Sequence, residues 1–571
     1  MSSSASPTDP LDAPELAPAT GNKSGSIRTP KSTVWFAAGA AFVAALAFLW
    51  PRRAPGLTFE DSGLLASVAS VFGIPHPPGY PLWTMLGGLA TRLGGVFGLE
   101  PAAATNSLST VASAGACAVL AGFAASRGAG AALGAACGLV LLVSNTFLAQ
   151  SAGTEVYALA TLVQLSFVAL ALSSAPRPFY VGAAFGLAAC AHLTSLLLVP
   201  LMLRSVRSFS ATGRLALGLG AGLLPFLYVP LRSLADPAID WGDPDTFERL
   251  LAHLGRLQYS GDFEPDRKGA VAFLLDQGPW QVLGPLVLAI GLTGRLLIRD
   301  RRAVGQIGWL LATTAGICAG LVAKAAYPEM LESVRWRLAG SHQVLVVALA
   351  VWVALAVSRA SASWTGRSTR AALGAGLLAA GLATPSPATK LPTDLSSAYG
   401  ASRYARGVLD QAPADAFLWI NRLGSTDILG FPLLYRQVAL QERPDLVLID
   451  RSALEMGWYR EQLAERAPQL KPALDQLGRA LESGDLLAPS ERRRASGLVF
   501  LAARADPRPL VATDPPGPAI LGREPLHPAG LLWWDSAPES ELLPRRVDLT
   551  GEPRSPWTDL LKKLAAERAR P

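Results

Sequence analysis

Residues 33–50 read TVWFAAGAAFVAALAFLW, and this uncharged run decides the class of fold. A helix rises about 1.5 Å per residue, so the run is long enough to cross the ~30 Å hydrocarbon core of a bilayer. Basic residues up to Lys31 precede it, and no convincing cleavage site of small residues follows. We therefore expect a retained signal-anchor helix with a cytoplasmic N-terminus, although Arg52 and Arg53 beyond the run oppose this orientation.

Further apolar runs fill the first two thirds of the chain. They cover 103–126, 128–154, 156–176, 215–231, 277–294, 303–323 and 371–389, together with 178–203 and 338–358, which are interrupted only by His192 and His342. Arginines cluster in the short loops between them, as in cytoplasmic loops. If these loops are cytoplasmic, residues 81–98 must lie in the membrane interface. The run 178–203 must then enter and leave the membrane on the same face, with a break at 191–194. The sequence predicts an α-helical polytopic membrane protein with about nine to eleven membrane helices.

Composition excludes several classes of protein. Half of the 571 residues are hydrophobic and 16% are charged, whereas soluble proteins carry about 25% charged residues. A cytosolic enzyme, a disordered chain and a small disulfide-stapled domain are excluded. The net charge of +7 comes from basic loops beside apolar runs, so nucleic acid is not an expected partner. The four cysteines lie in apolar runs without CxxC spacing, which favours packing over disulfides or zinc.

The chain divides into three predicted regions. Residues 1–31 are rich in Ser, Pro and Ala and are expected to form a disordered cytoplasmic tail. Residues 32–389 form the transmembrane domain, whose long loops lie on the outer face. Residues 390–571 are soluble in composition and are expected to form an extracytoplasmic α/β domain. In this last region the pattern predicts a strand, a helix and a second strand over 416–420, 428–441 and 445–450.

Candidate catalytic carboxylates follow the first apolar run. Glu60 and Asp61 stand before an apolar segment at the water boundary, where partial desolvation suits a carboxylate to act as a general base. The alternative is structural, because an Asp before a helix often serves as its N-cap. From this stretch alone, the cap is the favoured interpretation.

A second motif lies in the same loop. Three prolines and a glycine in the run from His76 to Pro81 fix a rigid, non-helical backbone around Tyr80. At the membrane face such a backbone is tolerated only where it lines a cavity or packs on protein. His76 is suited to donate to a phosphate or to orient a base, and a purely structural histidine has near-equal weight.

Further candidate binding residues lie at the ends of apolar runs. Glu155 and Tyr157 stand between two such runs, where an acid is costly unless it is paired or faces water. Arg232 follows the run 215–231, and its planar guanidinium matches the oxygens of a lipid phosphate. The alternative for each is a boundary residue that anchors a helix end at the interface.

The loop after Arg232 combines acidic and aromatic residues. It contains Asp240-Trp241-Gly242-Asp243-Pro244 and, further on, Gln258-Tyr259. The alternating acids resemble a calcium loop, but the intervening Trp and Pro argue against an EF-hand, and no metal site is expected. The sequence lacks Walker A, GxSxG and HExxH motifs, and its apolar runs lack the acid–base relays of pumps. Chemistry at the membrane surface is therefore favoured.

The order of these motifs resembles the protein O-mannosyltransferase-like family of membrane glycosyltransferases, long described as a domain of unknown function. The resemblance covers about residues 58–465. It is carried by Asp61-Ser62-Gly63, the run from Gly73 to Leu82, Asn106 to Ser109, Glu155-Val156-Tyr157, Arg232, Ile239 to Pro244, Gln258-Tyr259, Tyr435-Arg436-Gln437, Arg443-Pro444-Asp445 and Trp458-Tyr459.

The resemblance implies a GT-C fold with a catalytic acid in its first outer loop and a polyprenyl-phosphate sugar as donor. Asp61 matches that acid and would take a proton from the acceptor hydroxyl as its oxygen attacks the sugar C1, while nearby arginines stabilise the leaving phosphate. Mannose is the expected sugar, an extracytoplasmic protein Ser/Thr or a glycan the expected acceptor, and no cofactor is implied. The implied substrate-binding residues are Glu60, His76, Tyr80, Glu155, Tyr157, Arg232, Trp241, Asp243, Gln258 and Tyr259.

One departure from the family leaves alternatives open. The family commonly has Gly-Glu after its acid, whereas Gly63 is followed here by Leu64. Glu60 would substitute if that Glu assists the base. A transporter or flippase of a lipid-linked sugar, or a non-catalytic scaffold, are the alternatives to an enzyme. High usage of Ala, Gly and Arg indicates a GC-rich bacterial source, so the expected location is a bacterial inner membrane.

Overall fold

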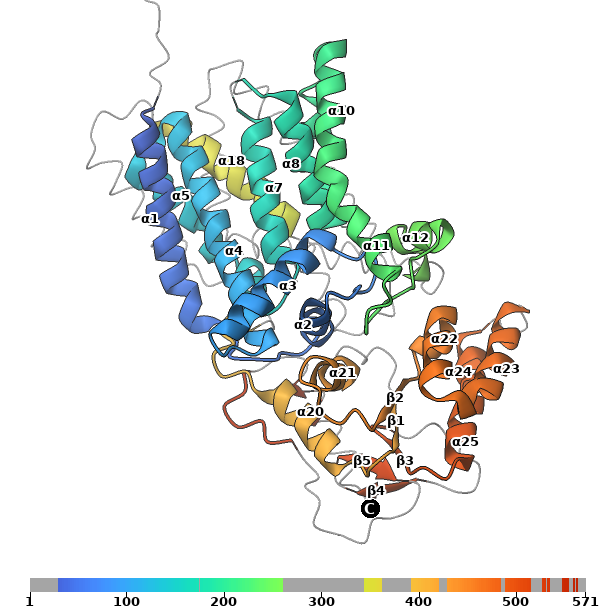
Figure 1. Ribbon diagram of the computed structural model, residues 1–571. Coiled ribbons are helices and arrows are strands. Elements are labelled where there is room, and N and C mark those ends of the chain that lie inside the picture. The colour runs from blue at the N-terminus through green and yellow to red at the C-terminus, as the bar shows by residue number, and fades with distance from the viewer. Residues whose placement is uncertain are drawn as a thin grey trace, which may run out of the picture.

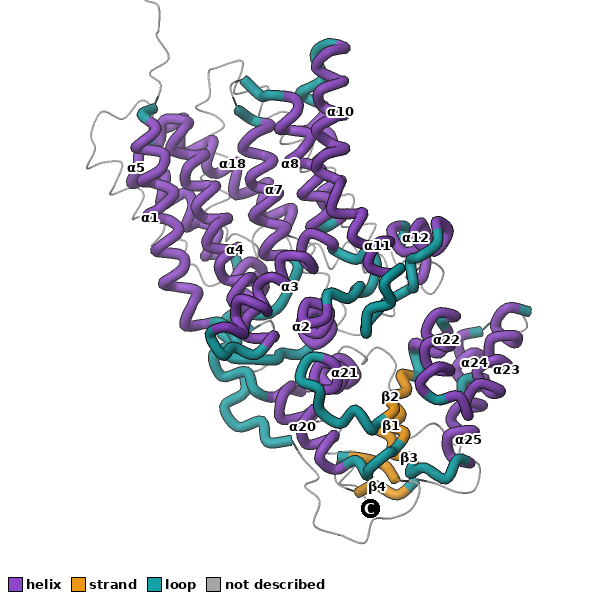
Figure 2. Tube along the Cα trace, viewed as in Figure 1, coloured by secondary structure: helices purple, strands orange, loops and turns teal. Residues whose placement is uncertain are grey.

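The structure is a computed structural model that is mostly helical, with a small sheet in the C-terminal third (Figures 1 and 2). The predicted spans 277–294, 303–323 and 371–389, and the tail 1–28, lie outside the described residues. The structure describes residues 29–173, 175–259, 343–361, 392–420, 429–483, 488–514, 526–529, 531–534, 547–553, 558–559 and 561–562.

Within the described residues, three helical stretches are long and apolar enough to cross a membrane: Lys31–Arg52, Pro101–Ala129 and Phe209–Ser233. They include α1 (Lys31–Leu49), α4 (Pro101–Ala124) and α10 (Phe209–Leu223). A fourth candidate is the pair Ala131–Val143 and Asn145–Ala152, which is bent by 81°. The chain therefore has a few candidate membrane helices, and the predicted number of nine to eleven stays a prediction.

The predicted break at 191–194 is present. Helix α8 (Pro178–Ala191) ends directly before His192, whose backbone is extended, and a 3-10 segment (Leu193–Leu198) leads into α9 (Val199–Leu203). The backbone N–H of Thr194 donates to Nδ1 of His192 at 3.1 Å, so the imidazole itself caps the new segment. Polar groups released by the break are thus satisfied within the protein.

Helix α3 (Pro81–Val96) is amphipathic and is not among the candidate spans. Met85, Leu89 and Leu93 recur every fourth residue and are between 41% and 56% exposed, while the opposite face buries Trp83 and Gly87. An exposed apolar stripe along a helix too short to span is typical of a segment that lies in the membrane interface.

Helices α8 and α10 approach each other through small residues. Gly182 and Gly186 on α8 face Gly218 and Gly222 on α10, and a Cβ at any of the four would overlap backbone atoms of the other helix. This reciprocal GxxxG arrangement is typical of tightly packed membrane helices.

The C-terminal region is built on a five-stranded sheet with the order β2-β1-β3-β5-β4. Strand β1 (Phe417–Ile420) pairs in parallel with both β2 (Val447–Asp450) and β3 (Leu510–Ala512), whereas β5 (Leu532–Trp534) runs antiparallel to β3 and to β4 (His527–Ala529). The two strands predicted at 416–420 and 445–450 are confirmed. The helix predicted at 428–441 is confirmed over its centre as α21 (Phe431–Val438).

Strand β1 is buried on both faces, so its side chains divide between two cores. Leu418 and Ile420 contact the layer of α20 (Gly400–Gln411) and α21. Phe417 and Trp419 contact the opposite layer, which contains α22 (Gly457–Arg466), α23 (Lys471–Glu482) and α25 (Gly497–Ala505). The result is a sheet between two helical layers, as Figure 1 shows.

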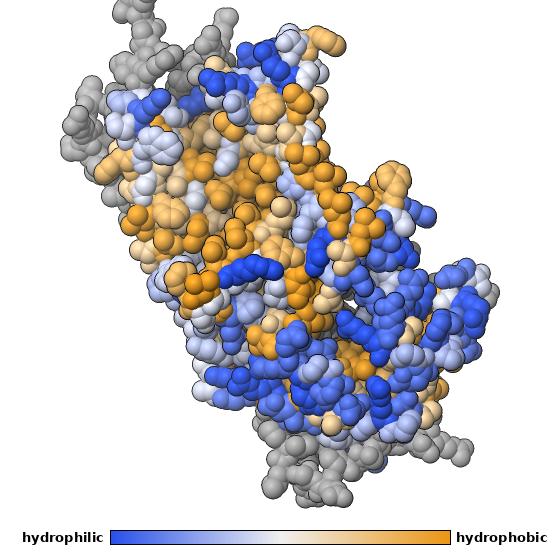
Figure 3. Space-filling model, viewed as in Figure 1, coloured by the Kyte–Doolittle hydropathy of each residue, from blue (hydrophilic) through white to orange (hydrophobic). Residues whose placement is uncertain are grey.

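Figure 3 shows apolar side chains over the helical part of the chain and hydrophilic side chains over the C-terminal region. The two parts meet where α2 (Ser62–Val71) packs on α21, burying Leu64 and Val68 against Phe431 and Val438. Several candidate site residues lie near this junction, in two segments that we call the first loop (51–80, which includes α2) and the second loop (234–246).

Candidate active site

The two central residues of the site are Asp61 and His76. Asp61 holds the N-cap position of α2, but its side chain makes no capping hydrogen bond. Its Oδ2 instead lies 3.1 Å from Nε2 of His76. The Asp61 side chain is 25% exposed and that of His76 only 12%. The capping interpretation is therefore wrong for the side chain, and the carboxylate is oriented by an imidazole.

The first loop is held in place by the second loop. The backbone N–H of Ile74 donates to the carbonyl of Ile239 at 2.8 Å, and the N–H of Trp241 donates to the carbonyl of Ile74 at 3.1 Å. These two bonds form a parallel bridge just before His76. The bridge fixes the backbone from which His76 reaches Asp61.

Aromatic rings surround His76. Tyr80 and Trp241 present their rings edge-on to it, with centroid separations of 5.5 and 6.1 Å. On the other side of Tyr80, the ring of His192 is stacked at 5.6 Å, and it also contacts Tyr157 at 5.0 Å. Edge-on and stacked rings fix orientation, so this shell restricts the rotation of His76.

Further charges reach this shell. The hydroxyl of Tyr157 lies within electrostatic range of Asp61, Glu155 and Arg256. The backbone of Glu155 is fixed by the indole of Trp83, whose Nε1 donates to its carbonyl at 3.1 Å. The charges of Asp61, Glu155 and Arg256 therefore all act on the hydroxyl of Tyr157.

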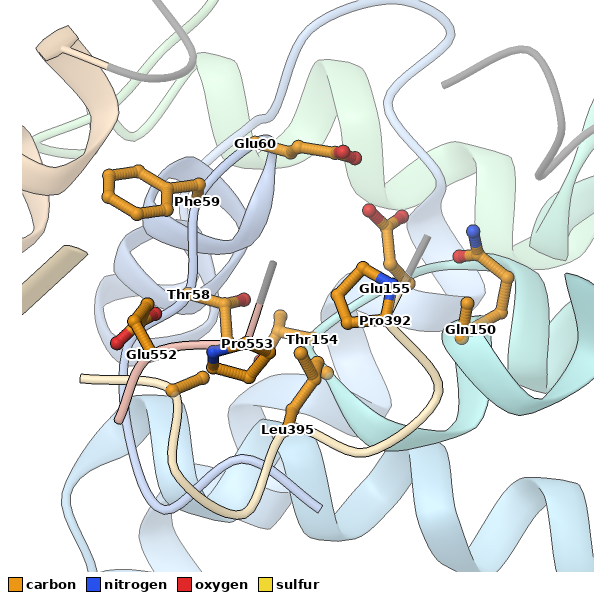
Figure 4. A pocket seen from close by; sticks show the side chains of 13 residues that line it. Thr58, Phe59, Glu60, Gln150, Thr154, Glu155, Pro392, Leu395, Glu552 and Pro553 are labelled. Atoms are coloured by element: carbon orange, nitrogen blue, oxygen red, sulfur yellow. The ribbon is translucent and has the colours of Figure 1, made fainter. Parts of the chain in front are cut away.

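A pocket opens beside Glu60, the residue before Asp61, between the first loop and the C-terminal region. It is lined by Thr58 to Glu60, by Ala149, Gln150 and Gly153 to Glu155, and by residues of the 392–398 and 552–553 segments. Figure 4 shows the carboxylates of Glu60 and Glu155 turned toward the same part of this pocket. The structure thus brings these two predicted residues together.

Arg232 has a structural contact that the sequence did not reveal. Its Nε donates to the carbonyl of Phe72 at 2.6 Å and its Nη2 to that of Val71 at 3.2 Å. A guanidinium at the C-terminal carbonyls of α2 stabilises the end of that helix. Its predicted contact with a lipid phosphate stays a prediction.

The second loop and α12 (Phe247–Leu254) place the remaining predicted residues. The indole Nε1 of Trp241 donates to Oε1 of Gln258 at 3.0 Å. The carboxylate of Asp243 pairs with Arg249, and Arg249 also reaches Glu461 of α22 at 3.2 Å. The side chain of Tyr259 lies outside the described residues. Among the described residues, no three His, Cys, Asp or Glu side chains are grouped as metal ligands.

Buried titratable groups lie beneath the loops. Asp240 is 3% exposed and accepts a 2.7 Å hydrogen bond from Ser233, and burial raises its pKa to about 6. Burial lowers the pKa of His253 to about 3. A Cβ at Gly79 would stand 3.1 Å from the His253 ring and one at Gly242 2.9 Å from it, so the neutral imidazole fills the space between the two loops.

Sequence reasoning missed three residues of this region as site residues: His192, His253 and Arg256. His192 was interpreted only as a break in an apolar run. A signal was available, because a histidine inside such a run is costly unless it faces a cavity or a partner. His253 and Arg256 carry no local signal, since only the folding of the second loop brings them to the site.

Several residues of the site have left-handed backbones. Glu60, Tyr80, Asp243 and Arg256 all have φ between 39° and 67°. Non-glycine residues adopt this region rarely and at a cost of roughly 1 kcal/mol or more, and such residues cluster at functional sites. The concentration of four of them at one junction supports a functional role for it.

Apolar helices with a charged, aromatic-lined site between loops at their ends define a membrane protein with a candidate active site at that end. Residues 61–209 match the family model described as the protein O-mannosyl-transferase TMEM260 N-terminal domain. The match begins at Asp61 and includes His76, Glu155 and His192.

A curated relative agrees with this match. The chain is 27% identical over 468 residues to mouse protein O-mannosyl-transferase TMEM260, an alignment that covers 73% of this chain and 62% of the relative. The chain therefore spans less than two thirds of the length of that protein. The two comparisons support an O-mannosyltransferase-like family for this chain, and they confirm the family that the motifs predict.

Proposed function

We propose that this chain is a membrane glycosyltransferase that moves a sugar, mannose, from a polyprenyl-phosphate donor to a hydroxyl of an extracytoplasmic protein. The observation that carries the proposal is the Asp61–His76 pair, because it supplies an oriented carboxylate within the residues that match the family model. The name of the mouse relative supports mannose as the sugar and a protein as the acceptor.

In the proposed reaction, the Asp61 carboxylate accepts the proton of the acceptor hydroxyl while its oxygen forms a bond to the sugar C1. The bond from C1 to the phosphate oxygen breaks, and its electron pair leaves with the polyprenyl phosphate. A partly buried carboxylate is suited to this role, since limited hydration keeps it available to a substrate proton. The chemistry needs no redox group.

His76 is proposed as a positioning residue. The Nε2–H of its imidazole donates to Oδ2 of Asp61 and so fixes the orientation of the carboxylate toward the acceptor. Holding a reacting group in one orientation avoids an entropic cost during the reaction. The aromatic shell of Tyr80 and Trp241 supports this orientation.

Arg256 is proposed to stabilise the leaving phosphate. Arg256 and Asp61 both act electrostatically on the hydroxyl of Tyr157, and a guanidinium in this part of the site would oppose the negative charge that develops on the phosphate. Arg232, which the sequence offered for this role, already binds carbonyl groups at the end of α2.

The proposed location is a bacterial inner membrane with the site and the C-terminal region outside the cytoplasm. The positive-inside pattern of the loops supports this orientation. Exposed apolar stripes on α3 support a site at the level of the lipid headgroups, within reach of a lipid-borne phosphate.

The test uses purified full-length protein in detergent with radiolabelled polyprenyl-phosphate mannose and a Thr-containing peptide. Asp61→Asn is compared with wild type and with Asp410→Asn, an exposed acid on α20 that is not part of the site. We expect transfer to fall by at least 100-fold in Asp61→Asn only, since general bases contribute roughly 10²–10⁴ to rate.

Equal transfer by wild type and Asp61→Asn would contradict the assignment of the base. Movement of intact donor across a vesicle membrane, without release of polyprenyl phosphate, would instead support the transporter alternative. If no donor is turned over and none is moved across the membrane, the result would favour a non-catalytic scaffold.

A further inference from the structure

The pocket beside Glu60 is a strongly hydrogen-bond-accepting environment. Its lining carries the carboxylates of Glu60, Glu155 and Glu552, and none of the described residues that line it is Lys, Arg or His. Glu552 uses Oε2 to accept the backbone N–H groups of Tyr399 and Gly400 at 2.8 and 2.7 Å. Glu60 and Glu155 are turned into the open part (Figure 4).

Gln150 supplies an independent sign of a ligand. Its side chain lines the pocket and the residue is only 7% exposed. Its Oε1 has no hydrogen-bond partner among the described residues. A buried amide oxygen without a donor is destabilised, so a ligand that carries N–H or O–H at this wall would supply the donor that Gln150 lacks among the described residues.

The lining also contains apolar side chains and prolines. They include Phe59, Pro392, Leu395 and Pro553, alongside the threonines Thr58 and Thr154 (Figure 4). An extended peptide offers both backbone N–H donors and apolar side chains, which match this combination. The described lining has no cationic side chain that would bind a phosphate, so this pocket is poorly suited to the donor phosphate.

We propose that this pocket binds the acceptor as an extended peptide segment, and that Glu60 and Glu155 select segments with basic or neutral residues beside the accepting Ser or Thr. The inference rests on the proposed function, and it adds the route by which the acceptor reaches Asp61. Acidic residues beside the hydroxyl are disfavoured, because they would face two carboxylates at short range.

The test uses three synthetic peptides that differ only in the residues on either side of one Thr: Lys, Ala or Asp. Their kcat/KM values are measured with the purified full-length protein and polyprenyl-phosphate mannose. We expect Lys-flanked peptide to be favoured over Asp-flanked peptide by about tenfold at low salt, and by less in 0.5 M NaCl, where screening is stronger.

Single substitutions test whether the preference for Lys-flanked over Asp-flanked peptide arises in the pocket. Glu60→Gln and Glu155→Gln are each expected to reduce the Lys-to-Asp ratio by about threefold. Gln150→Leu is expected to raise the KM of all three peptides by about fivefold while the ratio stays the same. Glu465→Gln on α22 removes an exposed acid that does not line the pocket, and it should leave the ratio at its wild-type value.

Binding of fluorescent versions of the peptides, measured by anisotropy without donor, separates this inference from the proposed function. Tighter binding of the Lys-flanked peptide that weakens in Glu60→Gln supports the pocket whether or not turnover occurs. Equal affinities, no binding, or a preference for Asp would overturn it. Turnover without charge preference would overturn the pocket assignment alone, and preference in binding without any transfer would overturn the proposed function alone.

Discussion

Gly63 lies directly beneath the backbone carbonyl of Phe431, so that a Cβ on Gly63 would overlap that carbonyl group. Gly63 is in the first turn of α2, two residues after Asp61, whereas Phe431 begins α21 in the C-terminal region. Through this contact, the position of Asp61, which we propose as the base, depends on how α21 packs against α2.

Gly63→Ala is therefore expected to separate α2 from α21 and to displace Asp61. A displacement of about 1 Å at a reacting group costs up to about 100-fold in rate, so we expect transfer to fall by 10-fold to 100-fold with little change in donor KM. The matched control is Gly95→Ala on α3, where a Cβ would meet nothing within 4 Å. Equal losses in both variants would contradict this account.

Leu64, the residue after Gly63, lies in an apolar environment that disfavours an acid at this position. Its side chain is fully buried with Ile239 and Phe431 at the junction. Leu64→Glu would place a carboxylate there without a partner, which costs several kcal/mol. We expect a lower melting temperature and faster proteolysis between the two regions, whereas Leu64→Met should cost less than about 1.5 kcal/mol. A rise in transfer without loss of stability would show that the acid belongs at this position.

The contribution of Asp240 to stability should fall as pH rises from about 4 to 6. Its pKa is raised to about 6, so the folded protein keeps a proton that the unfolded chain releases above its ordinary pKa of 3.8. Asp240→Asn removes this cost and should be more stable than wild type by roughly 3 kcal/mol above pH 6, with a smaller difference near pH 4. Melting curves at pH 4, 5, 6 and 7 measure this difference, and parallel curves would contradict it.

Substitution of His76 should distinguish the effect of its hydrogen bond to Asp61 from that of its packing against Tyr80 and Trp241. His76→Phe keeps a ring for Tyr80 and Trp241 but removes the hydrogen bond to Asp61. We expect kcat to fall by about 10-fold to 100-fold, and the acid limb of the pH–rate profile to move to higher pH, because the lost bond favoured the charged carboxylate. His76→Gln retains a donor and should recover part of both effects. A fall in kcat without a shift of the profile would indicate a structural role only.

The sequence predicts some elements well and others poorly, for physical reasons. The break at His192 was predictable because a polar residue interrupts an apolar run, and β1 and β2 were predictable because buried parallel strands are short apolar runs. Helices α22 and α23 were missed, since their Arg- and Pro-rich segments bury only one narrow face.

The site was predictable in its residue types and less so in their partners. Asp61, His76 and Glu155 stand out as polar groups next to apolar runs. Their pairing depends on contacts between distant segments, and Arg232 shows the difficulty: a guanidinium at a helix end is equally suited to a phosphate and to the carbonyls of Phe72 and Val71. Local sequence does not distinguish these acceptors.

The bridge between Ile74 and Asp240 links the two loops, which affects how the site can be transferred from one related protein to another. Gly79 in the first loop and Gly242 in the second both lie against the ring of His253, so a larger residue in either loop would press on the same side chain. We therefore expect a chimera that carries both loops from one parent to keep its activity better than one that carries a single loop.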